Sequence, residues 1–277
     1  MSESIIPTAH LFPILDHELI QLLQSLSEEE WNRPTIAKLW TVKDVAAHLL
    51  DVNVRTISMG RDKHFGNTAG DISTSEKLIN YLNNLNADWV KSMKRVSPKL
   101  LTELLALTGP AFCDQMAALP PFEPAIFSVG WAGDKTSPNW FHVAREYTEK
   151  WHHQQQIRDA VNKPGNLSTR ELYYPVLDTF MMALPHTYRS SKAPKNTVVQ
   201  VSINGESGGD WFLTKKEKWE LSKTTTLPVK AHTTIEASAA WKLFTKSWRR
   251  TEVNSFVTIE GDKKLGEVVL EMISVMA

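Results

Sequence analysis

Residues 140–161 read WFHVAREYTEKWHHQQQIRDAV and are followed by the helix-breaking sequence NKPG at 162–165. Apolar side chains recur at the helical interval, from Trp140 through Ala144 and Tyr147 to Trp151. Proline and glycine directly after such a pattern are typical of a helix end. The sequence therefore predicts one long helix over residues 140–161 with its apolar stripe facing a core.

Two potential metal ligands lie on this predicted helix. Glu149 and His153 are four residues apart, so a helix places them one turn apart on the same face. A carboxylate and an imidazole in this arrangement can both reach one ion. On a helical wheel they border the apolar side that includes Ile157, whereas His152 points to the opposite flank. This favours His153 over His152.

A third ligand is expected from another helix, because two ligands seldom hold a catalytic metal. His48 is the best candidate, since it lies in the apolar segment VAAHLLDV (45–52), where an unpaired imidazole would be costly. One carboxylate and two histidines suit Zn²⁺ and also Ni²⁺, Mn²⁺ or Fe²⁺. From these residues alone, two other interpretations stay open: a hydrogen-bonded structural histidine at 48, and an exposed helix pair of Glu149 with His153.

The first 165 residues carry further helix patterns. Apolar spacing predicts helices over 12–26, 41–60, 73–96 and 98–120. Thr41 and Asp44 form a capping-box arrangement at the start of the second, and Pro98 suits the first position of the fourth. Helices of this length with modest connections favour an antiparallel bundle.

After residue 165 the pattern changes. One helix is expected over 172–188, followed by strands in 197–204, 210–223 and 231–237, a helix over 239–248 and a return to strand over 255–273. We therefore predict a two-domain α+β chain, with a metal-binding antiparallel bundle of four or five helices in residues 1–165 and a smaller α+β domain in residues 166–277.

Composition excludes several classes of protein. Basic and acidic residues number 31 each, which argues against a protein that binds nucleic acid through its charge. No apolar run is long enough for a membrane span, and the N-terminus lacks a signal-peptide pattern, so a cytoplasmic protein is expected. The single cysteine, Cys113, excludes an internal disulfide and is expected to be buried rather than nucleophilic.

The two histidine-containing segments together carry a family resemblance. WTVKDVAAHL (40–49) followed by AREYTEKWHHQQQIRDAV (144–161) resembles the mycothiol-dependent maleylpyruvate isomerase family, within the DinB-like superfamily of metal-binding four-helix bundles. The family pattern maps onto His48, Glu149 and His153 as metal ligands. It also implies that the C-terminal α+β region is a sterol-carrier-like domain.

The resemblance implies a metal-dependent enzyme that acts with a low-molecular-weight thiol. The isomerases carry a functional arginine in a Leu-Thr-Gly-Arg-like segment, where this chain reads LFTKSWRR (243–250), so Arg249 and Arg250 become catalytic candidates after a two-residue shift. This departure leaves maleylpyruvate and mycothiol themselves open as substrate and thiol.

The leading hypothesis from the sequence is a metal-dependent, thiol-dependent transferase or isomerase that acts on a small electrophile. One divalent ion, Zn²⁺ first, and a low-molecular-weight thiol are its expected cofactor and cosubstrate. Two alternatives stay open: a non-enzymatic small-ligand-binding protein with a structural metal or none, and a metal-dependent hydrolase, because an open coordination position can also activate water. The sequence does not decide whether the chain forms a homodimer.

Overall fold

A computed structural model describes residues 5–66 and 75–275 of the chain. The chain divides into two compact units. Residues 7–123 and 146–167 form the N-terminal unit, and residues 124–145 and 168–275 form most of the C-terminal unit. A domain boundary between residues 165 and 166 stays a prediction.

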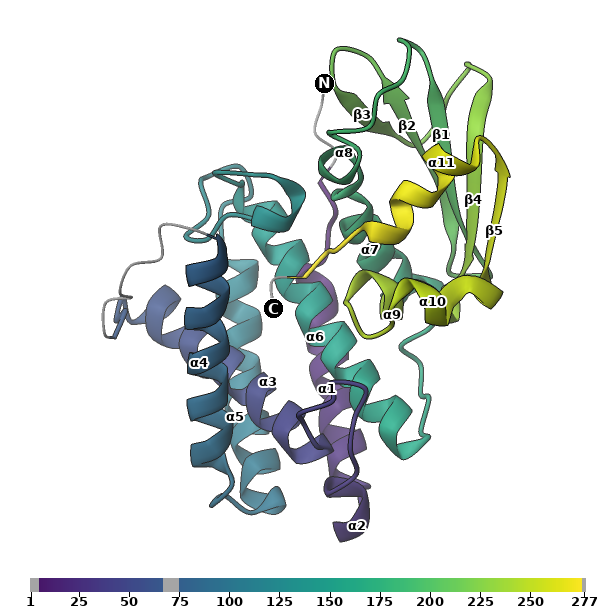
Figure 1. The fold of residues 1–277 in the computed structure, drawn as a ribbon. Helices are drawn as coiled ribbons and strands as arrows, with labels where there is room; N and C mark the ends of the chain where they lie inside the picture. Colours follow the sequence, from purple (N-terminus) through teal and green to yellow (C-terminus); the bar gives the residue numbers. More distant parts are fainter. Residues whose placement is uncertain (1–4, 67–74, 276–277) are drawn as a thin grey trace. The chain divides into compact units, whose positions relative to one another are not determined.

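The N-terminal unit is helical (Figure 1). Its elements are α1 (Phe12–Gln24), α2 (Glu28–Trp31), α3 (Val42–Thr56), a π-helical turn (Ile57–Arg61), α4 (Ser75–Met93), α5 (Pro98–Ala117) and the second part of α6 (Asn139–Val161). Helix α5 packs against α1 and α3, and α4 packs against α3. Residues 73 and 74 of the expected third helix lie outside the described residues.

Local signals set where two of these helices begin. The Thr41 hydroxyl accepts a hydrogen bond from the backbone N–H of Asp44, and the Asp44 carboxylate accepts one from the backbone N–H of Thr41. This capping box starts α3 as predicted. Helix α5 begins at Pro98, with the Ser97 hydroxyl accepting from the backbone N–H of Leu100. Both caps satisfy backbone donors that have no partner within the helix.

The core of the N-terminal unit holds α3 and α6 together. Buried side chains of α3, among them Val45 and Leu49, share one apolar cluster with Ile157 and Val161 of α6. The cluster is completed by Leu and Trp side chains of α1, α2 and α5. Because the two ligand-bearing helices contribute to the same core, their packing helps to fix the separation of the metal-ligand candidates.

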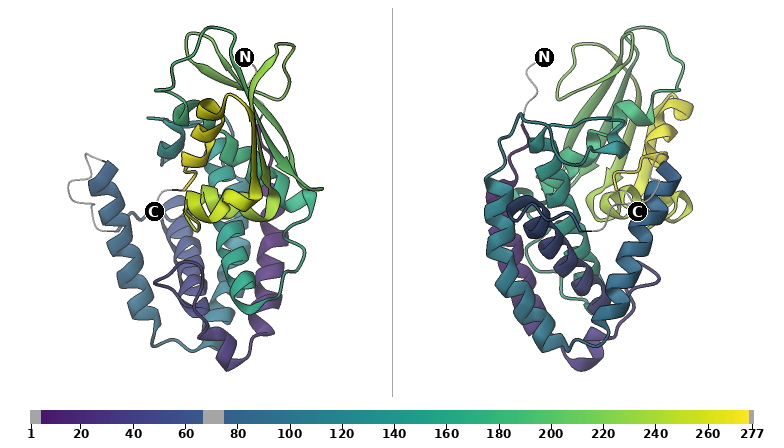
Figure 2. Two further views of the ribbon diagram at one scale, coloured as in Figure 1. Left: turned by 45° about the vertical axis from the view of Figure 1, so that its right-hand side comes forward. Right: turned by 90° about the vertical axis from the view of Figure 1, so that its left-hand side faces the viewer.

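The C-terminal unit is an α+β structure built on one five-stranded sheet (Figures 1 and 2). Its main elements are α7 (Arg170–Met181), α8 (Leu184–Thr187), β1 (Val198–Asn204), β2 (Gly209–Lys215), β3 (Trp219–Ser222), β4 (Val229–Glu236), α9 (Ala237–Phe244), α10 (Arg250–Val253), β5 (Val257–Gly261) and α11 (Lys263–Glu267). The strand order is β3-β2-β1-β4-β5, with β1 and β4 parallel and the other pairs antiparallel.

Helices α7, α9 and α11 pack on one face of this sheet. The Tyr173 hydroxyl of α7 donates to the carbonyl of Ala237 at the start of α9, and the Trp211 indole of β2 donates to Asp178 of α7. Thr233 of β4 donates to the carbonyl of Gly266 in α11. Inward-facing strand residues such as Trp211 are fully buried beneath these helices. The predicted fold class, a helical N-terminal bundle with a smaller C-terminal α+β part, is confirmed.

Three expectations for the C-terminal region were wrong in detail. The strand expected over 210–223 is two antiparallel strands, with β2 ending at Lys215 and β3 beginning at Trp219. The strand expected over 255–273 ends at Gly261, whose φ of 74° is left-handed. The Asp262 carboxylate then accepts from the backbone N–H of Leu265 and starts α11, so the apolar residues that follow are helical. The helix expected over 172–188 is divided into α7 and α8, with a proline in the first turn of α8.

No helix among residues 5–66 and 75–275 combines the length and apolar character needed to cross a membrane.

Candidate metal centre

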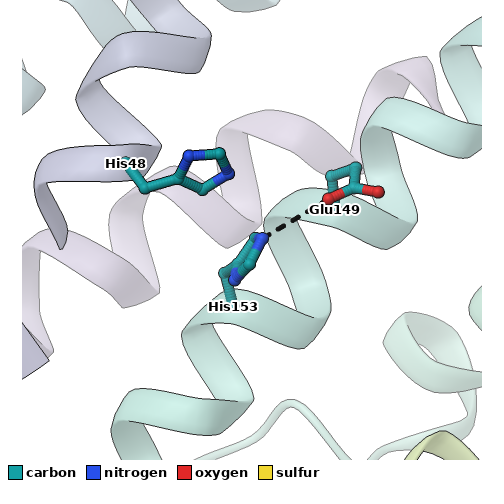
Figure 3. A group of neighbouring side chains, drawn as sticks. All are labelled: His48, Glu149 and His153. Carbon is teal, nitrogen blue, oxygen red and sulfur yellow. Dashed lines mark ion pairs between the residues drawn. The ribbon is translucent and has the colours of Figure 1, made fainter. Parts of the chain in front are cut away.

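Three side chains of the N-terminal unit converge as a group of potential metal ligands. His48 comes from α3, and Glu149 and His153 come from α6. Each offers one nitrogen or oxygen atom, and these atoms all lie within 4.8 Å of one another. Figure 3 shows both imidazole rings and the carboxylate turned toward a common centre. The structure therefore brings together all three ligand candidates predicted from the sequence.

The elements that carry these residues explain their placement. Helix α3 begins with the capping box at Thr41, which puts His48 about two turns into a helix whose buried face packs in the core. On α6 the four-residue spacing of Glu149 and His153 places them on one face, with His153 Nε2 3.4 Å from Glu149 Oε2. Both histidines are buried, whereas the Glu149 side chain is 22% exposed. The carboxylate therefore forms the more open side of the group.

A buried amide orients one of the two imidazoles. His153 Nδ1 lies 3.0 Å from Oε1 of Gln156, which is itself buried one turn further along α6. Among the described residues, the buried Nδ1 of His48 has no hydrogen-bond partner. The protein thus supplies an acceptor that selects the tautomer of His153, but not that of His48.

The electrostatics of the group favour a cation. Burial, and then the neighbouring His153, hold the pKa of His48 well below its ordinary value, so this imidazole is neutral at pH 7. Burial raises the pKa of Glu149, but its close neighbour His153, and then His152 and His48, outweigh burial and bring the pKa to about 2. A carboxylate that stays ionised beside imidazole lone pairs is a donor set that a divalent cation fits.

An indole ring borders the group. The Trp40 ring centroid lies 5.0 Å from that of His48 and 6.2 Å from that of His153, and the two imidazole centroids are 4.6 Å apart. Trp40 immediately precedes the Thr41 cap, so the residue that starts α3 also positions this ring. An aromatic wall of this kind excludes water from one side of the ligand group and strengthens its electrostatic interactions.

His152 does not join the ligand group among the described residues. Its Nδ1 lies 2.8 Å from the carbonyl oxygen of Thr148, and burial lowers the pKa of His152 to about 4. The preference for His153 over its neighbour therefore agrees with the geometry.

The two arginine candidates lie in the C-terminal unit. Arg250 forms ion pairs with Glu267 and Glu271, and Arg249 precedes α10, where its backbone N–H donates to Glu252. A catalytic role for either arginine stays a prediction.

Sequence reasoning missed Gln156 and Trp40. The run Gln154–Gln156 has the polar composition of a solvent-facing helix surface, yet all three glutamines are buried. The three-residue spacing between His153 and Gln156 was the signal that could have identified Gln156.

Comparisons with known proteins bear on the same residues. A family model, the mycothiol maleylpyruvate isomerase N-terminal domain, matches residues 12–158, which is more than half of the chain. The chain belongs to this family. The matched range includes His48, Glu149 and His153. A comparison with curated proteins gives no match.

Two solved structures share the fold. One is a histidine-to-alanine mutant of the mycothiol-dependent maleylpyruvate isomerase, with a TM-score of 0.54 and 10% identity. The other is the mycothiol-dependent maleylpyruvate isomerase, with a TM-score of 0.51 and 9% identity. Each match covers 91% of this chain and 91% of the other. The structural similarity therefore extends over both units of this chain.

Proposed function

We propose that this chain is a metal-dependent enzyme that uses a low-molecular-weight thiol. It either transfers the thiol to a small electrophilic substrate or isomerises such a substrate. The single observation that carries the proposal is the convergence of His48, Glu149 and His153 within 4.8 Å in a unit assigned to the mycothiol maleylpyruvate isomerase family. The family name supplies the first thiol and substrate to test, mycothiol and maleylpyruvate.

The donor set suits Zn²⁺ first, with Ni²⁺, Mn²⁺ and Fe²⁺ as other fits. Held by His48, Glu149 and His153, the ion would supply Lewis acidity, which favours the thiolate form of a thiol at neutral pH. Three protein ligands leave positions open, as in catalytic rather than structural sites. Glu149 would balance one positive charge of the ion, while Trp40 and the buried histidines shield the inner side of the group from water.

The protein's own thiol is unsuited to this role. Burial raises the pKa of Cys113 to about 11, so its thiol is protonated at neutral pH and is a poor nucleophile. Cys113 lies on α5 and lines a small pocket with Asp16 and Lys150, and none of the three ligand candidates lines this pocket. Cys113 is the only cysteine of the chain, so a thiolate used in the reaction would have to come from a cosubstrate.

Metal content of paired histidine variants tests the first half of the proposal. Purified wild-type protein is expected to carry about one equivalent of metal by elemental analysis. His153→Ala and His48→Ala are expected to lose it, whereas His152→Ala, a buried histidine next to the group, is the matched control and should keep it. Equal metal content in wild type and His153→Ala would contradict the assignment.

Turnover assays test the second half. Mycothiol with maleylpyruvate comes first, followed by other biological thiols with small electrophiles, each with and without a chelator. Turnover that needs both the thiol and the metal is the expected result. Turnover that is insensitive to the chelator would refute metal dependence, and turnover of an ester or amide without any thiol would instead indicate metal-assisted hydrolysis.

A further inference from the structure

We propose that Gln156 is a positioning residue of the metal centre, because it holds His153 in the tautomer whose Nε2 lone pair is available to the ion. This inference rests on the proposed metal site and adds a residue that does not itself bind the ion. Gln156 lies three residues after His153 on α6, and only 4% of its surface is exposed.

The direction of the hydrogen bond decides the tautomer. A neutral imidazole has one donor nitrogen and one acceptor nitrogen, and an amide oxygen can only accept. With Gln156 Oε1 3.0 Å from His153 Nδ1, the proton must lie on Nδ1, and Nε2 carries the lone pair. That lone pair then lies 3.4 Å from Glu149 Oε2, so two electron-rich atoms face each other. A cation between them relieves this repulsion.

The opposite amide orientation would give a different site. If the Gln156 NH₂ group donated to Nδ1, the proton would move to Nε2 and donate to Glu149, and His153 could not bind a metal ion through that atom. His153, Gln156 and Glu149 would then be hydrogen-bonded to one another without any ion. The orientation of one amide therefore separates a metal centre from a closed hydrogen-bond chain.

Gln156 is expected to contribute more to metal affinity than any residue around the His48 imidazole. Among residues 5–66 and 75–275, the buried Nδ1 of His48 has no hydrogen-bond partner, so its ring lacks a comparable support. Removing the partner of a ligating histidine typically weakens metal affinity by about 10–100-fold. The effect of Gln156 should fall in this range, since His153 is the ligand that the protein orients.

Two substitutions at Gln156 and one control distinguish these cases. Gln156→Leu removes the acceptor of the His153 hydrogen bond, and Gln156→Glu keeps an acceptor but removes the NH₂ donor. The control, Gln155→Leu, replaces the adjacent buried glutamine, whose Nε2 donates to Asp159. The measurement is Zn²⁺ affinity by competition with a chromophoric chelator. Circular dichroism and thermal unfolding of each metal-free variant report whether it is folded.

The expected result has a distinct order. Gln156→Leu should bind Zn²⁺ about 10–100-fold more weakly than wild type. Gln156→Glu should bind at least as tightly as wild type, because a carboxylate is the stronger acceptor, and Gln155→Leu should match wild type. Nitrogen NMR of metal-free wild-type protein should show His153 protonated on Nδ1, which tests the tautomer even if the leucine variant fails to fold.

Several outcomes would overturn the inference. Equal affinities of wild type and Gln156→Leu would show that the amide does not position His153. A loss in Gln156→Glu as large as that in Gln156→Leu would show that the NH₂ group is the one in use. Absence of Zn²⁺ binding by wild type would instead refute the proposed function itself, so the two failures are distinguishable.

Discussion

A buried lysine next to Glu149 connects the two helices that carry the metal-ligand candidates. Lys150 of α6 donates from Nζ to Oδ1 of Asn53 on α3, and both residues are at most 6% exposed. The ammonium group also lies 4.2 Å from the Phe112 ring centroid. Burial lowers the pKa of Lys150 to about 8, so the amine is still mostly protonated at pH 7. We predict that Lys150 and Asn53 stabilise the bundle as a coupled pair.

The expected loss of stability in each single variant comes from leaving the other member of the Lys150–Asn53 pair without its hydrogen-bond partner. Asn53→Leu removes the acceptor of a buried ammonium group, and a hydrogen bond to a charged group contributes about 1.5–3 kcal/mol. Lys150→Met leaves the Asn53 oxygen unsatisfied, at a cost of about 1–3 kcal/mol. The double variant replaces both groups with apolar ones and avoids either penalty. Its loss of stability should therefore be smaller than the sum of the single losses by about 1–3 kcal/mol.

The assay is urea unfolding of the metal-free protein, followed by circular dichroism, for wild type, both single variants and the double variant. Asn53→Asp is the matched control, since it keeps an acceptor of the same shape and should cost less than Asn53→Leu. Single losses that add to within about 0.5 kcal/mol would refute the coupling, because non-interacting sites behave in this way.

Three further predictions address the cap, the C-terminal unit and the metal. Burial raises the pKa of Asp44, but hydrogen bonds from Lys94 and Thr41 outweigh burial and lower the pKa overall. Asp44→Asn should therefore lower the free energy of unfolding by about 1–2 kcal/mol at pH 7. This difference from wild type should fade as the pH drops below the unfolded-state pKa near 4, measured by urea unfolding against pH. Tyr173→Phe removes a hydroxyl that bonds both Ala237 and Trp241 and should destabilise the C-terminal unit by about 1–3 kcal/mol in calorimetry. Adding Zn²⁺ at about 100 times its Kd to the metal-free protein should stabilise the N-terminal unit by about 2.7 kcal/mol, seen as a higher Tm that His153→Ala lacks.

The metal-ligand candidates could be predicted because they depend on short-range rules. The four-residue spacing puts Glu149 and His153 on one face whatever the tertiary structure, and the apolar stripe of the helix decides between His153 and His152. His48 needed one more argument, the cost of burying an imidazole in an apolar segment. That argument identifies His48 but not the residues that it approaches. The prediction that α3 and α6 come together therefore also depended on the family resemblance.

Other parts depend on contacts that one sequence does not encode locally. Lys150 and the glutamine run look like a solvent-facing surface, yet they are buried because other elements pack around α6. The apolar residues after Gly261 fit a strand as well as a helix, and the choice was made by the left-handed glycine and the Asp262 cap. Short apolar segments of this kind are ambiguous until their ends are known.

The bundle core implies that a metal ion here would serve chemistry rather than folding. Helices α3 and α6 share a large apolar cluster, and the Lys150–Asn53 hydrogen bond joins them beside Glu149, so interactions other than metal ligation hold the two ligand-bearing helices together. In small domains that depend on a structural metal, the binding free energy is the folding free energy, because nothing else holds the ligands together. Here the apolar core already does so. The metal-free protein should therefore keep its helical content, and removal of the ion should lower its stability only by the amount that mass action gives.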